Sequence, residues 1–306
     1  MELKKESFTI KKGLDIQLEG EAVRNLKTHL SSKSYIFPTD FRWFVPKLLV
    51  KEGDPVTVGT PLFCKKRDER VCVVSPVNGK ITQIVRGEKR VLEVIEIENE
   101  ATSIPKRCEI PENLSSSIIQ SLMLQNGLWP MLRQRPFSVI PSPDKKPKSL
   151  FISCFDSSPL APDFFFLLNN QKEMWQKGVE ILKLLLGEIP IYLGLNSNDN
   201  NSIFEETKDV NIRYFSGPHP AGNVGTQIHL VDPINKGESV WFIHPQDVVT
   251  IGRFFLKGEL SFDRIVALTG PELTETGYWK VNYGSDLKPL LMPLLHSDNV
   301  RLISGN

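Results

Sequence analysis

Two loops carry the residue types best suited to ligand binding: Phe155-Asp156-Ser157-Ser158-Pro159-Leu160-Ala161-Pro162-Asp163 and Gly217-Pro218-His219-Pro220-Ala221-Gly222-Asn223-Val224-Gly225-Thr226. A dinucleotide site needs G-x-G-x-x-G directly after a strand, because only glycine lets the backbone approach a pyrophosphate at a helix N-terminus. The first loop has no glycine, and its two prolines remove amide donors. The second loop lacks the lysine of a P-loop and reads as a tight turn that feeds a helix. The sequence therefore predicts neither a tightly held flavin nor NADH oxidation by this chain alone.

Other catalytic patterns are missing. The histidines form no H-E-x-x-H or other close ligand pair, and no G-x-S-x-G elbow occurs. The four cysteines have no C-x-x-C spacing, so the sequence assembles neither a zinc ribbon nor an iron-sulfur site locally; they are Cys64, Cys72, Cys108 and Cys154. We therefore assign no catalytic residue, no metal ligand and no bound cofactor to the chain.

The elements that position the two loops alternate between strand and helix. Strands are predicted at Ser149–Phe155, Pro190–Leu195, Val210–Phe215 and Arg264–Gly270, and helices at Asn169–Leu186 and Asp247–Leu256. This alternation indicates a parallel, Rossmann-like α/β sheet. The two loops follow the first and third strands, so both are expected at the carboxyl edge of the sheet, where ligands gather.

An earlier segment, Val45 to Glu98, reads as short strands separated by turns. Gly53 and Gly59 suit turns with positive φ, and Asn78-Gly79 is a hairpin signal. The order of these blocks resembles the biotinyl/lipoyl carrier fold, a barrel-sandwich of two similar halves. In true carriers a lysine at a hairpin tip receives the cofactor. The corresponding slot here contains Lys65 and Lys66 in a highly charged run without methionine, so we favour a solvated hairpin; a carrier or binding module that uses Lys65 or Lys66 is the alternative.

Length and composition fit a multidomain α/β protein. The chain has 306 residues, 40% of them hydrophobic, and a formal net charge of +1 with no long basic run, which disfavours nucleic-acid binding. No run approaches the roughly 18 apolar residues of a membrane-spanning helix, and the N-terminus has no signal-peptide core. We therefore expect a soluble cytoplasmic chain. The predicted units are a barrel-sandwich domain at 1–100, a helical and proline-rich connector at 101–148 with a helix over Ser115–Asn126, a Rossmann-like domain at 149–258, and a strand-rich segment at 259–306.

Motifs spread over nearly the whole chain resemble one family, the A subunits of bacterial sodium-translocating NADH:quinone oxidoreductases. They are Ile10–Ile16, Arg86–Arg90, Gly127–Pro130 and the two loops described above. The resemblance implies a peripheral subunit on the cytoplasmic side of the bacterial inner membrane, in a pump that couples electron transfer from NADH to ubiquinone to sodium export. It also implies that the NADH, flavin and iron-sulfur sites lie on other subunits. Family members continue into a β-grasp-like domain and a helical tail, so we expect a shortened chain that stops near the start of the β-grasp-like part.

The predicted binding surface lies on the two loops. An aromatic, proline-rich, weakly polar rim suits a flat quinone ring or another subunit better than a phosphate, and its residues are Phe155, Asp156, Pro159, His219, Pro220 and Gly222. The expected partners are ubiquinone and the other subunits of the reductase. Whether the chain binds quinone itself or only scaffolds the subunits that do is left open. A related electron-transfer subunit of a ferredoxin-linked complex would need clustered cysteines, which this sequence lacks.

Overall fold

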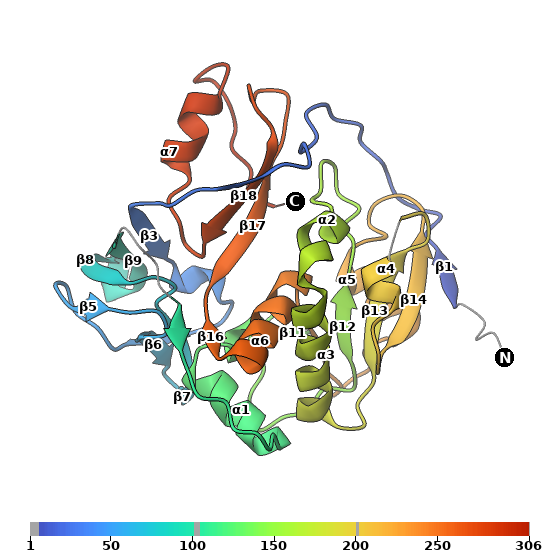
Figure 1. Ribbon diagram of the computed structural model, residues 1–306, viewed down its shortest axis with the longest axis horizontal. Coiled ribbons are helices and arrows are strands. Elements are labelled where there is room, and N and C mark those ends of the chain that lie inside the picture. The colour runs from blue at the N-terminus through green and yellow to red at the C-terminus, as the bar shows by residue number, and fades with distance from the viewer. Residues whose placement is uncertain (1–5, 101–104, 200–201, 306) are drawn as a thin grey trace.

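The computed structural model describes residues 6–100, 105–199 and 202–305. Two small antiparallel sheets form the barrel-sandwich, which lies beside a six-stranded sheet (Figure 1). A separate three-stranded sheet, which we call the third sheet, lies toward the top of that view. The first small sheet has the order β3 (Lys33–Ile36), β9 (Leu92–Asn99), β8 (Gly79–Arg86), β5 (Pro55–Val56), and the second has the order β4 (Pro46–Leu48), β6 (Pro61–Lys65), β7 (Asp68–Val74). Their inner faces bury aliphatic side chains such as Leu62, Ile81 and Ile97 completely. Burial of these alternating side chains holds the two sheets together.

The turn glycines behave as expected, but the Asn78-Gly79 signal does not make a hairpin. Gly53 and Gly59 have φ of 89° and 87°. Strands β7 and β8 belong to different sheets, and the segment between them crosses from one sheet to the other. The Asn78 side chain accepts a hydrogen bond from Val58 N at 2.9 Å, and a Cβ on Gly79 would lie 2.1 Å from the carbonyl oxygen of Glu98. Gly79 is therefore needed where the backbone passes close to that of Glu98. A close approach of two backbones favours glycine, as a turn does.

Two short strands in the first hundred residues lie outside the barrel-sandwich. Strand β1 (Ser7–Thr9) pairs in parallel with β14, and β2 (Leu26–Thr28) pairs in parallel with β18. Figure 1 shows the intervening segment in blue, rising from β1 over the upper right of the molecule. The unit predicted at 1–100 therefore contributes strands to the barrel-sandwich, to the six-stranded sheet and to the third sheet. Strands β1 and β2 form because the edges of the last two sheets offer unpaired backbone groups to this extended segment.

The large sheet has the order β1, β14 (Asn211–Ser216), β13 (Ile191–Asn196), β12 (Leu150–Ser153), β15 (Val240–Phe242), β11 (Arg133–Arg135). All neighbours are parallel except β11, which is antiparallel to β15. The fourth strand of the parallel series is therefore β15, and the prediction that Arg264–Gly270 supplies it was wrong. Arg264–Gly270 corresponds to β17 (Asp263–Leu268), which pairs with β18 in the third sheet.

The predicted helices are confirmed with small shifts. Helix α1 (Ser116–Gln125) is capped by Ser115, whose hydroxyl accepts from Ile118 N, and α3 (Lys172–Leu186) and α6 (Pro245–Lys257) match the other two. Helices α3 and α6 pack closely because glycines remove side chains at their contact: a Cβ on Gly252 would lie 1.7 Å from the carbonyl oxygen of Met174. The other α-helices among the described residues are α2 (Phe164–Leu168), α4 (Ser202–Glu205), α5 (Val224–Val231) and α7 (Lys288–Leu291). No helix among the described residues is long and apolar enough to cross a membrane.

The third sheet is tied to α6 by a buried ion pair. It consists of β17, β18 (Gly277–Asn282) and β2, while β16 (Glu259–Leu260) pairs with β10 (Lys106–Arg107). Arg253 on α6 pairs with Asp263, whose carboxylate also accepts from Ser261 at 2.6 Å and lies 3.0 Å from Lys280. Burial alone would raise the pKa of Asp263, but Arg253 and the hydrogen bonds outweigh it and hold that pKa well below its usual value. The charged form is therefore the one that the fold stabilises.

Candidate functional site at the carboxyl edge

The two predicted loops meet at the carboxyl edge of the large sheet. Ser157, in the loop after β12, accepts a hydrogen bond from Gly222 N at 2.8 Å, and its hydroxyl lies 3.1 Å from His219 Nδ1. The hydroxyl of Ser153, at the end of β12, lies 2.9 Å from the carbonyl oxygen of Gly222. A Cβ on Gly222 would lie 2.4 Å from Ser157 N. A glycine is therefore required at position 222 for the second loop to pack against the backbone of the first loop at Ser157.

The second loop feeds a helix, as the sequence predicts. Asn223 caps α5, because its side-chain oxygen accepts a hydrogen bond from Gly225 N at 2.9 Å. The N-terminal segment covers the same loop: His219 N donates to Asp15 at 3.0 Å, and Leu14 N donates to the carbonyl oxygen of His219 at 3.1 Å. The polar groups of the loop thus bind other parts of the chain, which gives the loop a fixed shape.

The predicted site residues fall into two groups. Phe155 and Asp156 line a pocket of about 430 Å³ at the carboxyl ends of β12 and β13, which we call the carboxyl-edge pocket. Phe155 is buried on its other side against Phe215 and Ala221. The other four predicted residues do not line the pocket; they are Pro159, His219, Pro220 and Gly222.

The carboxyl-edge pocket combines aromatic walls with acidic groups. Its aromatic side chains are those of Phe155, Phe164, Phe165 and Phe204, and its charged side chains are those of Arg24, Asp156, Asp163 and Asp199. Three carboxylates therefore face one guanidinium. Arg24 pairs with Asp163 at 2.6 Å, but it is 70% exposed, so the pair contributes little. Burial raises the pKa of Asp199. The pocket therefore holds more carboxylates than cations.

Sequence reasoning did not place several of these lining residues. Asp199 follows β13, and the carboxyl end of a second parallel strand is a general signal that could have pointed to it. Arg24 comes from a segment 139 positions before its partner Asp163, and no local pattern links them. Phe164 and Phe165 lie in a run that the sequence marks as hydrophobic, and they supply both core and pocket wall.

Comparison with known proteins assigns the chain to a family. Three family profiles match it: an "NqrA N-terminal barrel-sandwich hybrid domain" at residues 8–100, an "NqrA second alpha/beta domain" at 114–260 and an "NQRA C-terminal domain" at 265–306. A protein of Actinobacillus pleuropneumoniae serotype 5b, named as the A subunit of a Na(+)-translocating NADH-quinone reductase, is 35% identical over 307 residues, which cover 98% of this chain and 68% of the relative. The chain belongs to the NqrA family.

A second relative of the same name supports the assignment. The protein of Haemophilus influenzae strain Rd is 34% identical over 304 residues, with 98% of this chain and 68% of the relative covered. The family expected from the sequence motifs is therefore confirmed, together with its barrel-sandwich and α/β domains. A solved NAD+-reducing [NiFe]-hydrogenase is similar at a TM-score of 0.42 and 12% identity, covering 59% of this chain and 39% of that one, a likeness too slight to support an argument.

The hairpin at the carrier-like slot is short in this NqrA chain. Strands β6 and β7 are joined by a two-residue turn at Lys66 and Arg67, and Lys65 is the last residue of β6. Lys66 is exposed, while Lys65 is half-buried. A solvated hairpin stays the prediction, and modification of either lysine stays the alternative.

Folding also brings together two cysteines of this NqrA chain that no sequence motif links. Cys64 and Cys72 lie directly opposite each other on β6 and β7. Burial and the neighbouring Cys64 raise the pKa of Cys72 to about 11. Among the residues that the structure describes, no group of three or more histidine, cysteine or acidic side chains is placed to hold a metal ion.

Proposed function

We propose that this chain works as the A subunit of a sodium-translocating NADH:quinone reductase, docked on the cytoplasmic side of the inner membrane, and that its carboxyl-edge pocket binds the quinone headgroup. Membership of the NqrA family supports the subunit role. The character of the carboxyl-edge pocket supports the ligand. The other subunits of the reductase are the proposed partners, and ubiquinone is the proposed ligand.

The observation that carries the quinone proposal is the combination of phenylalanine walls with an excess of carboxylates. A quinone headgroup is flat, uncharged and bears two carbonyl acceptors, so it needs apolar walls and a few donors. Phe155 and Phe165 offer apolar walls, and Arg24 and Asn198 are donors at the same pocket. The volume of about 430 Å³ is within the range of small-molecule sites. A pyrophosphate would meet three acidic groups instead.

The same features support the proposal that NADH and flavin are bound by other subunits and that this chain holds no flavin or iron-sulfur centre. The strand order β14, β13, β12, β15 corresponds to the first four positions of the doubly wound order, which supports a Rossmann-like domain. The loop after its first strand nevertheless has prolines where a dinucleotide site has glycines. The antiparallel pair of β17 and β18 supports the start of a β-grasp-like domain.

Two neighbouring phenylalanines make a matched test. Phe165 lines the pocket, whereas Phe166, on the same short helix and also half-buried, packs against Tyr278 with ring centroids 4.8 Å apart. Phe165→Ala removes part of a buried aromatic contact, worth about 1 kcal/mol, and should weaken binding of a short-chain ubiquinone roughly fivefold in equilibrium dialysis. Phe166→Ala should bind as the unmodified chain does.

Equal affinity in both variants would refute the pocket assignment. If the unmodified chain bound no quinone, its role would be only that of a scaffold, and its assembly with the other subunits would still test the first part of the proposal.

A further inference from the structure

A second and larger cavity lies on the barrel-sandwich side of the molecule. It has a volume of about 690 Å³ and is lined by the β6–β7 hairpin, the loop around Trp43 and the segment 139–144. We call it the cationic pocket. Its volume lies within the usual range of small-molecule sites. None of its lining residues belongs to the carboxyl-edge pocket.

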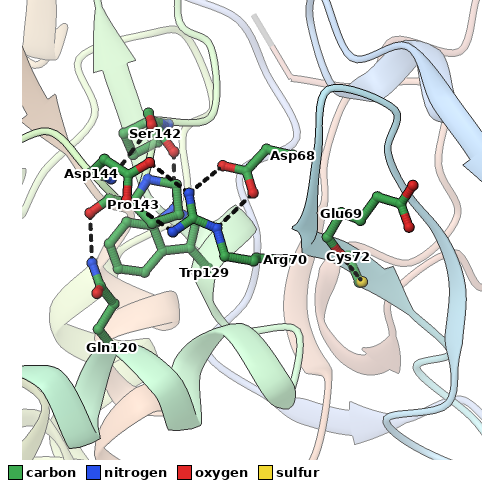
Figure 2. A network of polar contacts seen from close by, with 10 residues as sticks. Asp68, Glu69, Arg70, Cys72, Gln120, Trp129, Ser142, Pro143 and Asp144 are labelled. Atoms are coloured by element: carbon green, nitrogen blue, oxygen red, sulfur yellow. Dashed lines mark hydrogen bonds and ion pairs between the residues drawn. The ribbon is translucent and has the colours of Figure 1, made fainter.

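The charges of the cationic pocket are unbalanced. Arg42, Lys65, Arg67 and Arg70 line it together with two carboxylates, Asp68 and Asp144. Both carboxylates form ion pairs with Arg70, whose Nη2 lies 2.8 Å from Asp68 Oδ2 and 2.7 Å from Asp144 Oδ2 (Figure 2). Among the described residues, the other three cations have no carboxylate within ion-pair distance. The four cations and two carboxylates that line the pocket therefore leave it with a formal charge of +2.

A further cation, Arg135, does not line the pocket but is close enough to Arg42 to feel its charge. The pKa of Arg135 is lowered, first by burial and then by the charge of Arg42. The Nε of Arg135 is buried and has no hydrogen-bond partner in the described part of the chain. An anion bound beside Arg42 would relieve this repulsion.

The wall opposite the hairpin is held in place by hydrogen bonds to its backbone. Gln120 on α1 donates to the carbonyl oxygen of Pro143 at 2.6 Å, and the indole of the buried Trp129 donates to that of Pro141 at 3.0 Å. Figure 2 shows Gln120, Trp129 and the Arg70 fork around this segment. The pocket is thus formed before any ligand binds, which lowers the entropic cost of binding.

An exposed aromatic pair lies at the edge of the cationic pocket. Trp43 is 63% exposed and has φ of 58°, and Phe137 is 52% exposed with φ of 80°. Their ring centroids are 4.7 Å apart. Non-glycine residues with positive φ are strained, and such strain concentrates at ligand-binding sites. Large exposed aromatics beside arginines also typify binding surfaces.

From these observations we propose that the cationic pocket binds a phosphate ester that carries an apolar group, with the phosphate between Arg42, Lys65 and Arg67 and the apolar group against Trp43. Guanidinium groups match phosphate oxygens in geometry as well as in charge. Either a soluble phosphate ester or a phospholipid headgroup has this chemistry. This site is separate from the proposed quinone pocket and does not depend on it.

Tryptophan fluorescence can report on this site. The other four tryptophans, Trp129, Trp175, Trp241 and Trp279, are at most 4% exposed, so acrylamide quenching in the purified full chain monitors Trp43. Phenyl phosphate should protect Trp43 from quenching, and neutral phenol should not. Arg67→Glu should weaken this protection about tenfold through the loss of charged hydrogen bonds. Lys236→Glu makes the same charge change at an exposed loop position and should leave the protection unchanged.

The source of the phosphate is distinguished with vesicles. Protection by phosphatidylglycerol vesicles but not by phosphatidylcholine vesicles, with weak protection by phenyl phosphate, would assign the pocket to a lipid headgroup. Saturable protection by phenyl phosphate without vesicles would assign it to a soluble ester. The proposal is overturned if neither probe protects Trp43, if phenol protects equally well, or if Arg67→Glu and Lys236→Glu behave alike.

Discussion

Replacement of Gly222 by alanine tests whether the two loops at the carboxyl edge are interlocked. The added Cβ would lie 2.4 Å from Ser157 N and 2.8 Å from the Cα of Asp156, both of them backbone atoms. Ordinary van der Waals contact begins at 3.4 Å, so one loop must retreat by about 1 Å. Gly222 does not have positive φ, so the backbone conformation itself accepts alanine.

The expected cost follows from the contacts that such a shift removes. The hydrogen bond from Gly222 N to Ser157 Oγ, now 2.8 Å, and the contact of its carbonyl oxygen with Ser153 Oγ, now 2.9 Å, would both exceed hydrogen-bond length. Each is worth about 1 kcal/mol, and forced overpacking costs about 1–3 kcal/mol. We therefore expect the free energy of unfolding to fall by about 3–5 kcal/mol.

Urea denaturation followed by circular dichroism measures this change, and Gly225→Ala is the matched control. A Cβ on Gly225 meets only the side-chain oxygen of Asn223, at 3.2 Å, and alanine is favoured over glycine within helix α5 by about 1 kcal/mol. The control should therefore change the unfolding free energy by no more than about 1 kcal/mol. If Gly222→Ala were as mild as the control, the loops would not be held together by this contact.

Two further predictions concern buried ionisable groups. Asp263→Asn leaves the positive charge of Arg253 buried without its partner and should cost about 3–5 kcal/mol at neutral pH. Because the pKa of Asp263 is lowered on folding, the charged carboxylate contributes stability above about pH 4, near its unfolded pKa, and loses that contribution as the pH falls further. Urea denaturation at several pH values should therefore show that the difference in unfolding free energy between the unmodified chain and Asp263→Asn becomes small only in acid. A difference that is constant with pH would contradict this. Cys72 lies beside Cys64 and has a pKa of about 11, so little of it is thiolate at pH 7.5. It should react with iodoacetamide roughly a hundredfold more slowly than free cysteine at that pH. Rapid labelling of Cys72, detected by peptide mass spectrometry, would contradict this prediction.

The long amphipathic helices could be predicted from sequence because their signals are local. The helix at Ser115–Asn126 has a capping serine and helical spacing within its own length, and the structure begins α1 at Ser116. Strands β1 and β15 have three residues each, too few for a period, and they form because neighbouring strands offer backbone partners. Asn78 and Gly79 are residue types that favour turns, but here they lie where the chain crosses from one sheet to the other instead of forming a hairpin.

The candidate site was predictable in its place but not in its composition. Parallel strands place their following loops at one edge, so the meeting of the loops after β12 and β14 followed from the strand pattern. The pocket itself also requires Arg24 and Phe204, which reach it from distant segments. The cationic pocket likewise joins the hairpin at Arg67 to the segment around Asp144, and no periodicity encodes that contact.

The central claim is that this NqrA-family chain works as one component of a sodium-translocating reductase. Affinity purification of the full-length tagged protein from its native membranes in mild detergent, scored for co-purifying subunits, bound flavin and NADH:quinone activity, tests this claim most directly. We predict recovery of a multi-subunit complex whose activity sodium stimulates and whose flavin is carried by other subunits. Recovery of the chain alone, with a covalent group on Lys65 or Lys66, would contradict the account and favour a carrier.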